Sequence, residues 1–214
     1  VMLFNLTNYR LELRGEQCLK PAIRNEKKIK LLVVRAKEIP SLVGNGQVDM
    51  GLVGNDFVEE YGSNVTDMGD LGYNESGLGN VLWVLAVPKD QKSKYKSLKD
   101  FKNKKISTEL PNITKKFFVK KGIPVQIITS HGSTESHAPF LSDAIVDLAE
   151  TGRSLKANGL VPLYKIKESS VHLYAHNNSL AYGWKRRKME EIAKELKKAC
   201  KKLPKNPKKI VKLF

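Results

Sequence analysis

The stretch DAIVDLAETGRSL, residues 143–155, joins a short apolar segment to a turn rich in groups that bind sugars and phosphates. Residues 144–148 predict a strand, and Ser154 marks the start of a helix, so the turn lies at the carboxyl end of the strand. The first backbone N–H groups of a helix are unpaired and attract anions. Gly152 has no Cβ, which lets a phosphate approach the backbone, and Thr151 adds a hydroxyl donor.

Two acids and a base complete this turn. Asp147 and Glu150 would repel a phosphate, but their oxygens suit the 2′ and 3′ hydroxyls of a ribose. Arg153 adds a positive charge. Phosphate donors beside ribose acceptors indicate a site for a ribose 5-phosphate group. The same residue types also form ordinary capped turns between a strand and a helix, and their chemistry alone leaves both interpretations open.

The elements that position this turn alternate between strand and helix. Residues 29–36 (IKLLVVRA) are a continuous apolar run, typical of a strand buried on both faces. A short helix follows, then a second strand, a Gly-Asn turn and a helix that begins at Asp56. This rhythm predicts a parallel α/β sheet. Functional side chains in such sheets gather at the carboxyl ends of strands, here Arg35 and residues 51–56.

The second half of the chain repeats the pattern. The longest apolar run, residues 81–87, is followed by the polar and basic stretch DQKSKYKSLKDFKNKK, which favours a domain boundary. We therefore expect an α/β protein of two lobes, each a mainly parallel sheet flanked by helices, with a ligand site in the cleft. Lobe I comprises residues 1–86 with 165–203, lobe II residues 87–164 with the turn described above, and residues 204–214 form a basic tail.

DAIVDLAETGRSLKANGL resembles the phosphoribosyl diphosphate (PRPP) motif of the ATP phosphoribosyltransferases, the first enzymes of histidine biosynthesis. It follows LLVVRAKEIPSLVGNGQVDMGLVGND, DLG, VLAVP, KISTELPNITKKFF and GSTE, which stand in the family's order. The resemblance covers roughly residues 9–177. It implies a two-lobed fold of the type II periplasmic-binding-protein kind. It also implies transfer of the phosphoribosyl group of PRPP to N1 of ATP in the cytoplasm, with Mg²⁺ as cofactor.

The resemblance also assigns roles to individual residues. The catalytic positions are Glu135, Asp147 and Arg35. The positions that bind PRPP are Asp147, Glu150, Thr151, Gly152, Arg153 and Ser154. The positions that bind ATP are Gly54, Asn55, Asp70, Thr108, Asn112 and Thr114. No residue is assigned as a ligand of a protein-bound metal, and the four histidines, His131, His137, His172 and His176, have no metal-ligand spacing.

The sequence also departs from the family pattern. Family members begin with a strand and a Lys-Gly-Arg turn ahead of the segment that VMLFNLTNY resembles, and neither is present in this sequence. The stretch between Glu135 and Asp143 is shorter than usual, and Ser154 stands where threonine is common. About 10 residues follow the last predicted helix, too few for the regulatory domain of long-form members. The resemblance therefore implies the short form, a dimer-based homo-oligomer that works with a regulatory subunit resembling histidyl-tRNA synthetase.

Composition and charge argue against several other classes of protein. The net charge is +16, but residues 185–214 hold thirteen Lys or Arg and three Glu, so the other 184 residues carry only +6. Such confinement favours a solvated basic helix over a nucleic-acid-binding surface. No apolar run approaches the roughly 18 residues of a membrane span, and no signal peptide is recognisable at the start. The main alternative to an enzyme is a two-lobed protein that binds a small anion or solute without catalysis.

Overall fold

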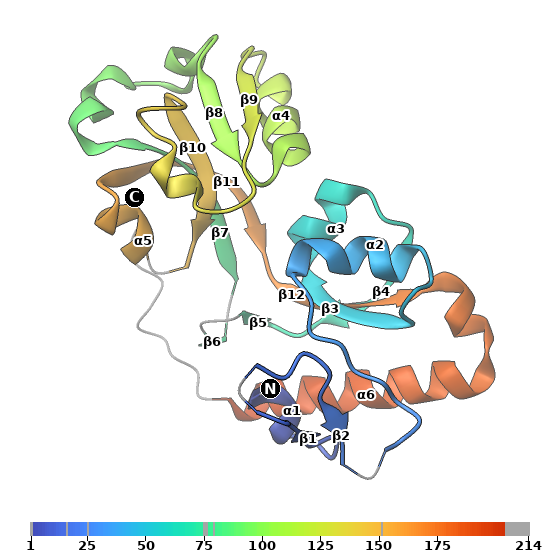
Figure 1. Ribbon diagram of the computed structural model, residues 1–214. Coiled ribbons are helices and arrows are strands. Elements are labelled where there is room, and N and C mark those ends of the chain that lie inside the picture. The colour runs from blue at the N-terminus through green and yellow to red at the C-terminus, as the bar shows by residue number, and fades with distance from the viewer. Residues whose placement is uncertain are drawn as a thin grey trace. The chain divides into compact units, whose positions relative to one another are not determined.

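The computed structural model of this 214-residue chain describes residues 2–15, 17–24, 26–74, 77–78, 80–150 and 152–203 (Figure 1). The chain divides into two compact units. Unit 1 consists of Val1–Gly79 and Ser170–Lys205, and the described part of unit 2 is Asn80–Ser169. No helix in the described ranges is long and apolar enough to cross a membrane.

These boundaries differ from the expected ones, which lay at residues 86/87 and 164/165. The reason is the pairing of β7 (Val81–Pro88) with β11 (Leu160–Ser169), which runs antiparallel from Val81 opposite Ser169 to Pro88 opposite Leu160. Both strands therefore belong to unit 2 along their whole length. The basic stretch expected to mark a boundary lies inside this unit, where it forms the 3₁₀ helices η2 (Lys89–Lys94) and η3 (Leu98–Phe101). Phe101 anchors it, since this side chain is fully buried.

Unit 1 is built on a three-stranded sheet in the order β3-β12-β4. The strands are β3 (Met50–Gly54), β12 (Val171–His176) and β4 (Val65–Asp70), and β12 is antiparallel to both neighbours. The helices α2 (Ile39–Gly44) and α3 (Asn55–Tyr61) lie across the sheet from α6 (Gly183–Lys202), as Figure 1 shows. The α6 side holds a core that includes Leu173, Ile192 and Leu196.

Unit 1 also contains several smaller elements. They are α1 (Met2–Asn5), the pair β1 (Leu11–Glu12) and β2 (Ala22–Ile23), η1 (Ala36–Glu38), the pair β5 (Tyr73–Asn74) and β6 (Gly77–Leu78), and η5 (Asn177–Ala181). Leu3, Tyr9 and Ile23 join the core beneath α6.

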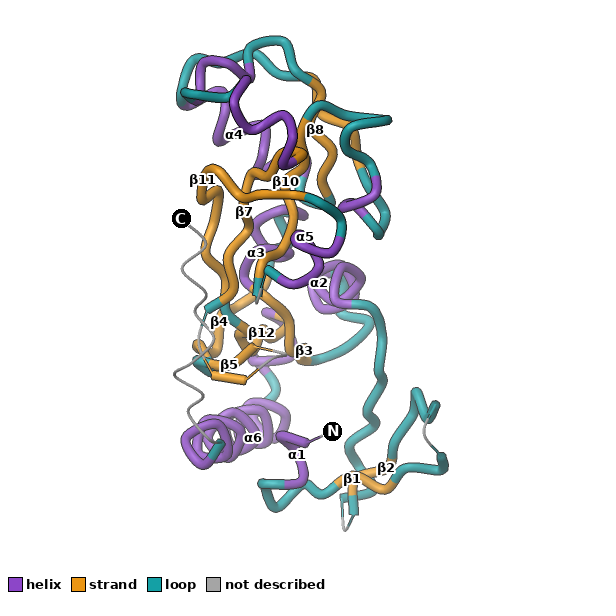
Figure 2. The backbone as a smooth tube through the Cα atoms, turned by 90° about the vertical axis from the view of Figure 1, so that its left-hand side faces the viewer, coloured by secondary structure: helices purple, strands orange, loops and turns teal. Residues whose placement is uncertain are grey.

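Unit 2 has a five-stranded sheet in the order β11-β7-β10-β8-β9. The strands β8 (Lys105–Thr108), β9 (Gln126–Thr129) and β10 (Ala144–Ala149) run parallel, and β7 is antiparallel to β10. The helices α4 (Pro111–Lys120) and α5 (Arg153–Ala157) follow β8 and β10, which Figure 2 labels. The 3₁₀ helix η4 (Thr134–Ser136) follows β9. The carboxyl ends of the three parallel strands therefore meet at one edge of the sheet.

The expectation of mainly parallel sheets needs correction. Both described ladders of the unit 1 sheet are antiparallel, and unit 2 has two parallel and two antiparallel ladders. The cause is that two strands from late in the sequence join earlier strands. β11 pairs with β7, and β12 pairs with β3 and β4. The strand predicted at residues 29–36 is also absent. Residues 29–35 are in no described ladder, and Leu32, Val33 and Val34 are 49%, 44% and 40% exposed.

Candidate functional site

The turn after β10 has the backbone geometry that its sequence predicts. Gly152 is the N-cap of α5 and has φ 66°, in the left-handed region that favours glycine. Arg153 and Ser154 form the first turn of that helix, and Glu150, which directly follows β10, is half-buried. Thr151 lies outside the described residues. The described part of the turn thus presents a helix start directly after a parallel strand.

A hydroxyl of this turn holds a carboxylate from another loop. Ser154 Oγ donates a hydrogen bond to Oε1 of Glu135, which is in η4 after β9. The loop before η4 is fixed from inside, because buried Thr134 donates from Oγ1 to Oγ of Ser130 at 2.8 Å. Two loops that follow different strands are therefore joined at the carboxyl edge of the sheet, and one of the joining groups is an acid.

Asp147 is the second acid of this group. Val146 pairs with Thr108 in parallel register, so the next residues, Asp147 and Glu109, lie at the same level on adjacent strands. Burial first, and then the negative charges of Glu135 and Glu109, raise the pKa of Asp147 to about 7. The Leu148 N–H, which donates to Asp147 Oδ1 at 2.7 Å, acts in the opposite direction. Asp147 therefore keeps its proton to a higher pH than an ordinary aspartate does, beside two other carboxyl groups.

Glu109 was not among the residues expected from the sequence. It directly follows the strand 105–108, and its place at the carboxyl end of a predicted parallel strand was the available signal. Its Oε1 lies 3.9 Å from where a Cβ on Gly132 would stand, which puts it beside the loop after β9. The structure thus brings together Asp147, Glu135 and Glu109, of which the sequence indicated two.

The remaining expected residues of unit 2 lie around the start of α4. Thr108 is fully buried, and its Oγ1 accepts a hydrogen bond from the Leu110 N–H at 3.0 Å. Thr114 is also fully buried, and its Oγ1 has no hydrogen-bond partner in the described part of the chain. Asn112 is exposed in the first turn of α4. Asn112 is therefore the most accessible of the three to a ligand.

Unit 1 places three of its four expected residues at one edge of its sheet. Gly54 is opposite Val171, and Asp70 is opposite His172, on the two sides of β12. Asn55 opens α3, and its backbone N–H donates to the Ser170 carbonyl at 3.1 Å. Arg35 is exposed and caps η1, where its N–H donates to Glu38 Oε2 at 3.0 Å.

A polar network at this edge involves His172, to which the sequence assigned no role. Its Nδ1 lies 2.8 Å from Asp67 Oδ2, and its Nε2 lies 3.2 Å from Ser170 Oγ and 3.8 Å from Asp70 Oδ1. The ring stacks on Tyr174 with 5.8 Å between centroids. Burial, and then the charges of Asp67, Asp56 and Asp70, raise the pKa of Tyr174 to about 12. The network fixes Asp70, one of the expected ligand-binding residues, beside a histidine.

No three His, Cys, Asp or Glu side chains in the described ranges form a group that could hold a metal ion. The carboxyl groups around Asp147 nevertheless supply the oxygen donors that Mg²⁺ prefers.

The chain matches the family model described as HisG, ATP phosphoribosyltransferase, over residues 35–198. It is 41% identical over 138 residues to ATP phosphoribosyltransferase of Thermodesulfovibrio yellowstonii, covering 64% of this chain and 47% of the relative. It is 43% identical to that of Koribacter versatilis, with the same shares covered. The chain therefore spans about half the length of the curated relatives it matches.

Comparison with solved structures leads to the same family and to its fold. The ATP phosphoribosyl transferase (HisG:HisZ) complex from Thermotoga maritima gives a TM-score of 0.72 at 27% identity, covering 93% of this chain and 90% of that one. The substrate binding protein of an amino acid ABC transporter gives 0.52 at 20% identity, covering 76% of this chain and 71% of that one, and shows the fold alone. These likenesses confirm the predicted α/β architecture of the periplasmic-binding-protein type. Because the family model matches residues 35–198, more than half of this chain, the chain belongs to the ATP phosphoribosyltransferase (HisG) family.

Proposed function

We propose that this chain transfers the phosphoribosyl group of PRPP to N1 of ATP and releases pyrophosphate, the first step of histidine biosynthesis. The observation that carries the proposal is the turn after β10. There a helix start capped by Gly152 adjoins the linked groups Ser154 and Glu135 and the carboxyl of Asp147. The backbone N–H groups at a helix start can bind a phosphate, and carboxyl groups can accept hydrogen bonds from ribose hydroxyls.

In this proposal the 5-phosphate of PRPP lies on the backbone N–H groups of Gly152 and Arg153, with the hydroxyls of Thr151 and Ser154 as further donors. Asp147 and Glu150 accept hydrogen bonds from the ribose hydroxyls. The bond from C1 of the ribose to the pyrophosphate oxygen breaks as N1 of ATP bonds to C1. Positive charge develops on the ribose in between, and the carboxylate of Glu135 stabilises it.

ATP and the departing pyrophosphate are assigned to the residues Arg35, Gly54, Asn55, Asp70, Thr108, Asn112 and Thr114. Arg35 supplies a charge for phosphate oxygens, and Gly54 and Asn55 lie where β3 ends and α3 begins. Mg²⁺ would be held mainly by the substrate phosphates, with a carboxylate such as that of Glu135 as a further oxygen donor, and when bound it would neutralise charge on the pyrophosphate. The reaction is assigned to the cytoplasm.

Partners are proposed on the same basis. The Thermotoga maritima structure is a HisG:HisZ complex, and this chain covers 90% of the matched chain. We therefore assign this chain a second, regulatory subunit of the kind that resembles histidyl-tRNA synthetase, and a dimer-based assembly.

The test is an assay for phosphoribosyl-ATP. ATP, PRPP and Mg²⁺ are added to the chain with and without such a subunit, and product formation is monitored by ultraviolet absorbance. Product that depends on both substrates is expected with the subunit present. PRPP and ATP that bind without any product would instead support the alternative of a solute-binding protein.

A further inference from the structure

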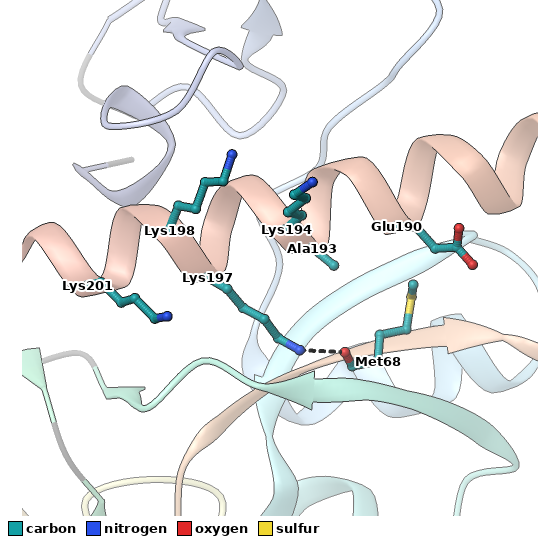
Figure 3. Close-up of a pocket in the computed structure, with 7 residues that line it drawn as sticks. All are labelled: Met68, Glu190, Ala193, Lys194, Lys197, Lys198 and Lys201. Atoms are coloured by element: carbon teal, nitrogen blue, oxygen red, sulfur yellow. Dashed lines mark hydrogen bonds between the residues drawn. The ribbon is translucent and has the colours of Figure 1, made fainter.

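A basic pocket lies between α6 and β4 in unit 1, and none of the residues assigned to substrates lines it (Figure 3). Its volume is about 400 Å³, within the range of small-ligand sites. Met68 and Ala193 give it an apolar wall. The charged residues that line it are Lys194, Lys197, Lys198, Lys201 and Glu190. Four ammonium groups against one carboxylate give the pocket a strong preference for anions.

The lysines share one side of the helix because of their spacing. Positions 194, 197, 198 and 201 follow the three- and four-residue steps that place side chains along one stripe of an α-helix. The opposite stripe, which includes Ile192, Leu196 and Ala199, is buried in the core of unit 1. Burial of that stripe fixes the direction in which the lysine stripe faces, so the cluster is a fixed feature of the fold.

Few of these charges are neutralised within the described part of the chain. Lys194 and Lys201 make no hydrogen bond or ion pair there. The carboxylates of this helix segment are already engaged, since Glu190 accepts from Arg186 Nε at 2.9 Å and Glu195 accepts from Lys198 at 3.0 Å. An anion that binds in this pocket would offset the positive charge of the lysines that line it.

Lys197 shows that the backbone of β4 is shaped around an ammonium group. Its Nζ donates to the Met68 carbonyl at 3.1 Å, as the dashed line in Figure 3 marks. The next residue, Gly69, has φ 118°, and a Cβ there would collide with that Nζ. Only glycine allows both this backbone angle and this approach. One of the three N–H donors of Lys197 is used by the carbonyl, which leaves donors for a ligand.

We propose that this pocket binds a small anion with several phosphate groups. Lysine suits such a ligand because its compact charge and three donors engage phosphate oxygens without a fixed geometry. The helix stripe spans two turns, which matches a ligand with more than one phosphate better than a single ion.

Inorganic tripolyphosphate is the probe, titrated by calorimetry into the whole chain at 0.15 M salt, where weak surface attraction is largely screened. The wild-type protein is expected to bind it. The double variant Lys194→Gln/Lys201→Gln should bind about tenfold more weakly, because two nearby charges are lost. The matched control is Lys115→Gln/Lys116→Gln, which removes two exposed lysines of α4 in unit 2 and should leave this binding unchanged.

Equal affinity of the wild type and the Lys194/Lys201 variant would overturn the proposal, as would an equal loss in both double variants. Tripolyphosphate that bound elsewhere, for example at the turn after β10, would give equal affinities for the wild type and the Lys194/Lys201 variant. Gly69→Ala is a second variant, expected to displace Lys197 and weaken binding while every lysine is retained. These outcomes do not depend on whether the chain transfers a phosphoribosyl group.

Discussion

At the scale of single residues, the acids around Asp147 are the most informative group. The sequence indicated Asp147 and Glu135 as candidate ligands, because acids beside a glycine turn suit a ribose. Its only sign of Glu109 was the position of this residue after a predicted strand, and the closeness of Glu109 to Asp147 depends on the parallel register of β8 and β10. It also gave no sign that burial and two neighbouring carboxylates raise the pKa of Asp147 to about 7. Chemical type is visible in a sequence, whereas the spacing of groups across strands is not.

The raised pKa of Asp147 has a consequence for stability. Between about pH 4 and pH 7 the folded protein holds a proton at Asp147 that the unfolded chain releases, so folded stability falls as the pH rises through this window. Asp147→Asn removes the ionisation. We expect its stability relative to wild type to be roughly 2–3 kcal/mol higher at pH 8 than at pH 5, because the wild type loses the stabilising proton between these pH values. Urea unfolding at both pH values measures this, and a variant-to-wild-type difference that does not change with pH would contradict it.

The hydrogen bond between Ser154 and Glu135 gives a second prediction. Removing either group breaks the same link, so the effects of Ser154→Ala and Glu135→Ala on unfolding free energy should not add. A coupling energy of about 0.5–1.5 kcal/mol is expected from chemical denaturation of the two single variants and the double variant. Ser136→Ala is the control for Ser154→Ala, since Ser136 Oγ donates only to the nearby Ser133 carbonyl. Strict additivity would show that the two loops are not coupled through this bond.

At the scale of elements, local patterns predicted some strands even though their partners lie far along the chain, as β7 and β8 do from β10. The strand 144–148 and the Gly152 turn were found because apolar residues run directly into turn residues. The strand expected at residues 29–36 was wrong, although its composition is typical of buried strands. Apolar composition shows that a segment can form a strand, but a ladder also requires a neighbour, and residues 29–35 have none among the described strands. Their apolar side chains are therefore left partly exposed.

That exposure predicts an effect on solubility. The adjacent exposed side chains of Leu32, Val33 and Val34 form an apolar stretch outside any described ladder through which chains can associate, although the Val33 N–H donates to the Leu19 carbonyl at 2.9 Å. Val33→Lys should slow aggregation at 37 °C, followed by light scattering, because a charge in the middle of the segment opposes such association. Val119→Lys is the matched control, since Val119 is 68% exposed but stands on the helix α4. Equal effects of both substitutions would point to net charge rather than to this segment.

At the scale of the whole molecule, the ordered series of motifs predicted the fold class and the family. The boundaries of the two units were harder to predict from the sequence, because they depend on the pairing of β7 with β11, about 80 residues away along the chain. The same holds for β12, which inserts between β3 and β4 and makes the unit 1 sheet antiparallel. Alternating strands and helices are typical of parallel sheets, but a late strand that returns to an early sheet leaves no local trace in the sequence.

The central claim is that the turn after β10 binds the ribose 5-phosphate of PRPP. Its most direct test is a calorimetric titration with PRPP and Mg²⁺ of the wild type and of Thr151→Val/Ser154→Ala, with Ser136→Ala as the control. Loss of two hydroxyl donors to a charged phosphate should weaken binding by about 100-fold while the control binds as the wild type does. Unchanged PRPP affinity in the double variant would contradict the account.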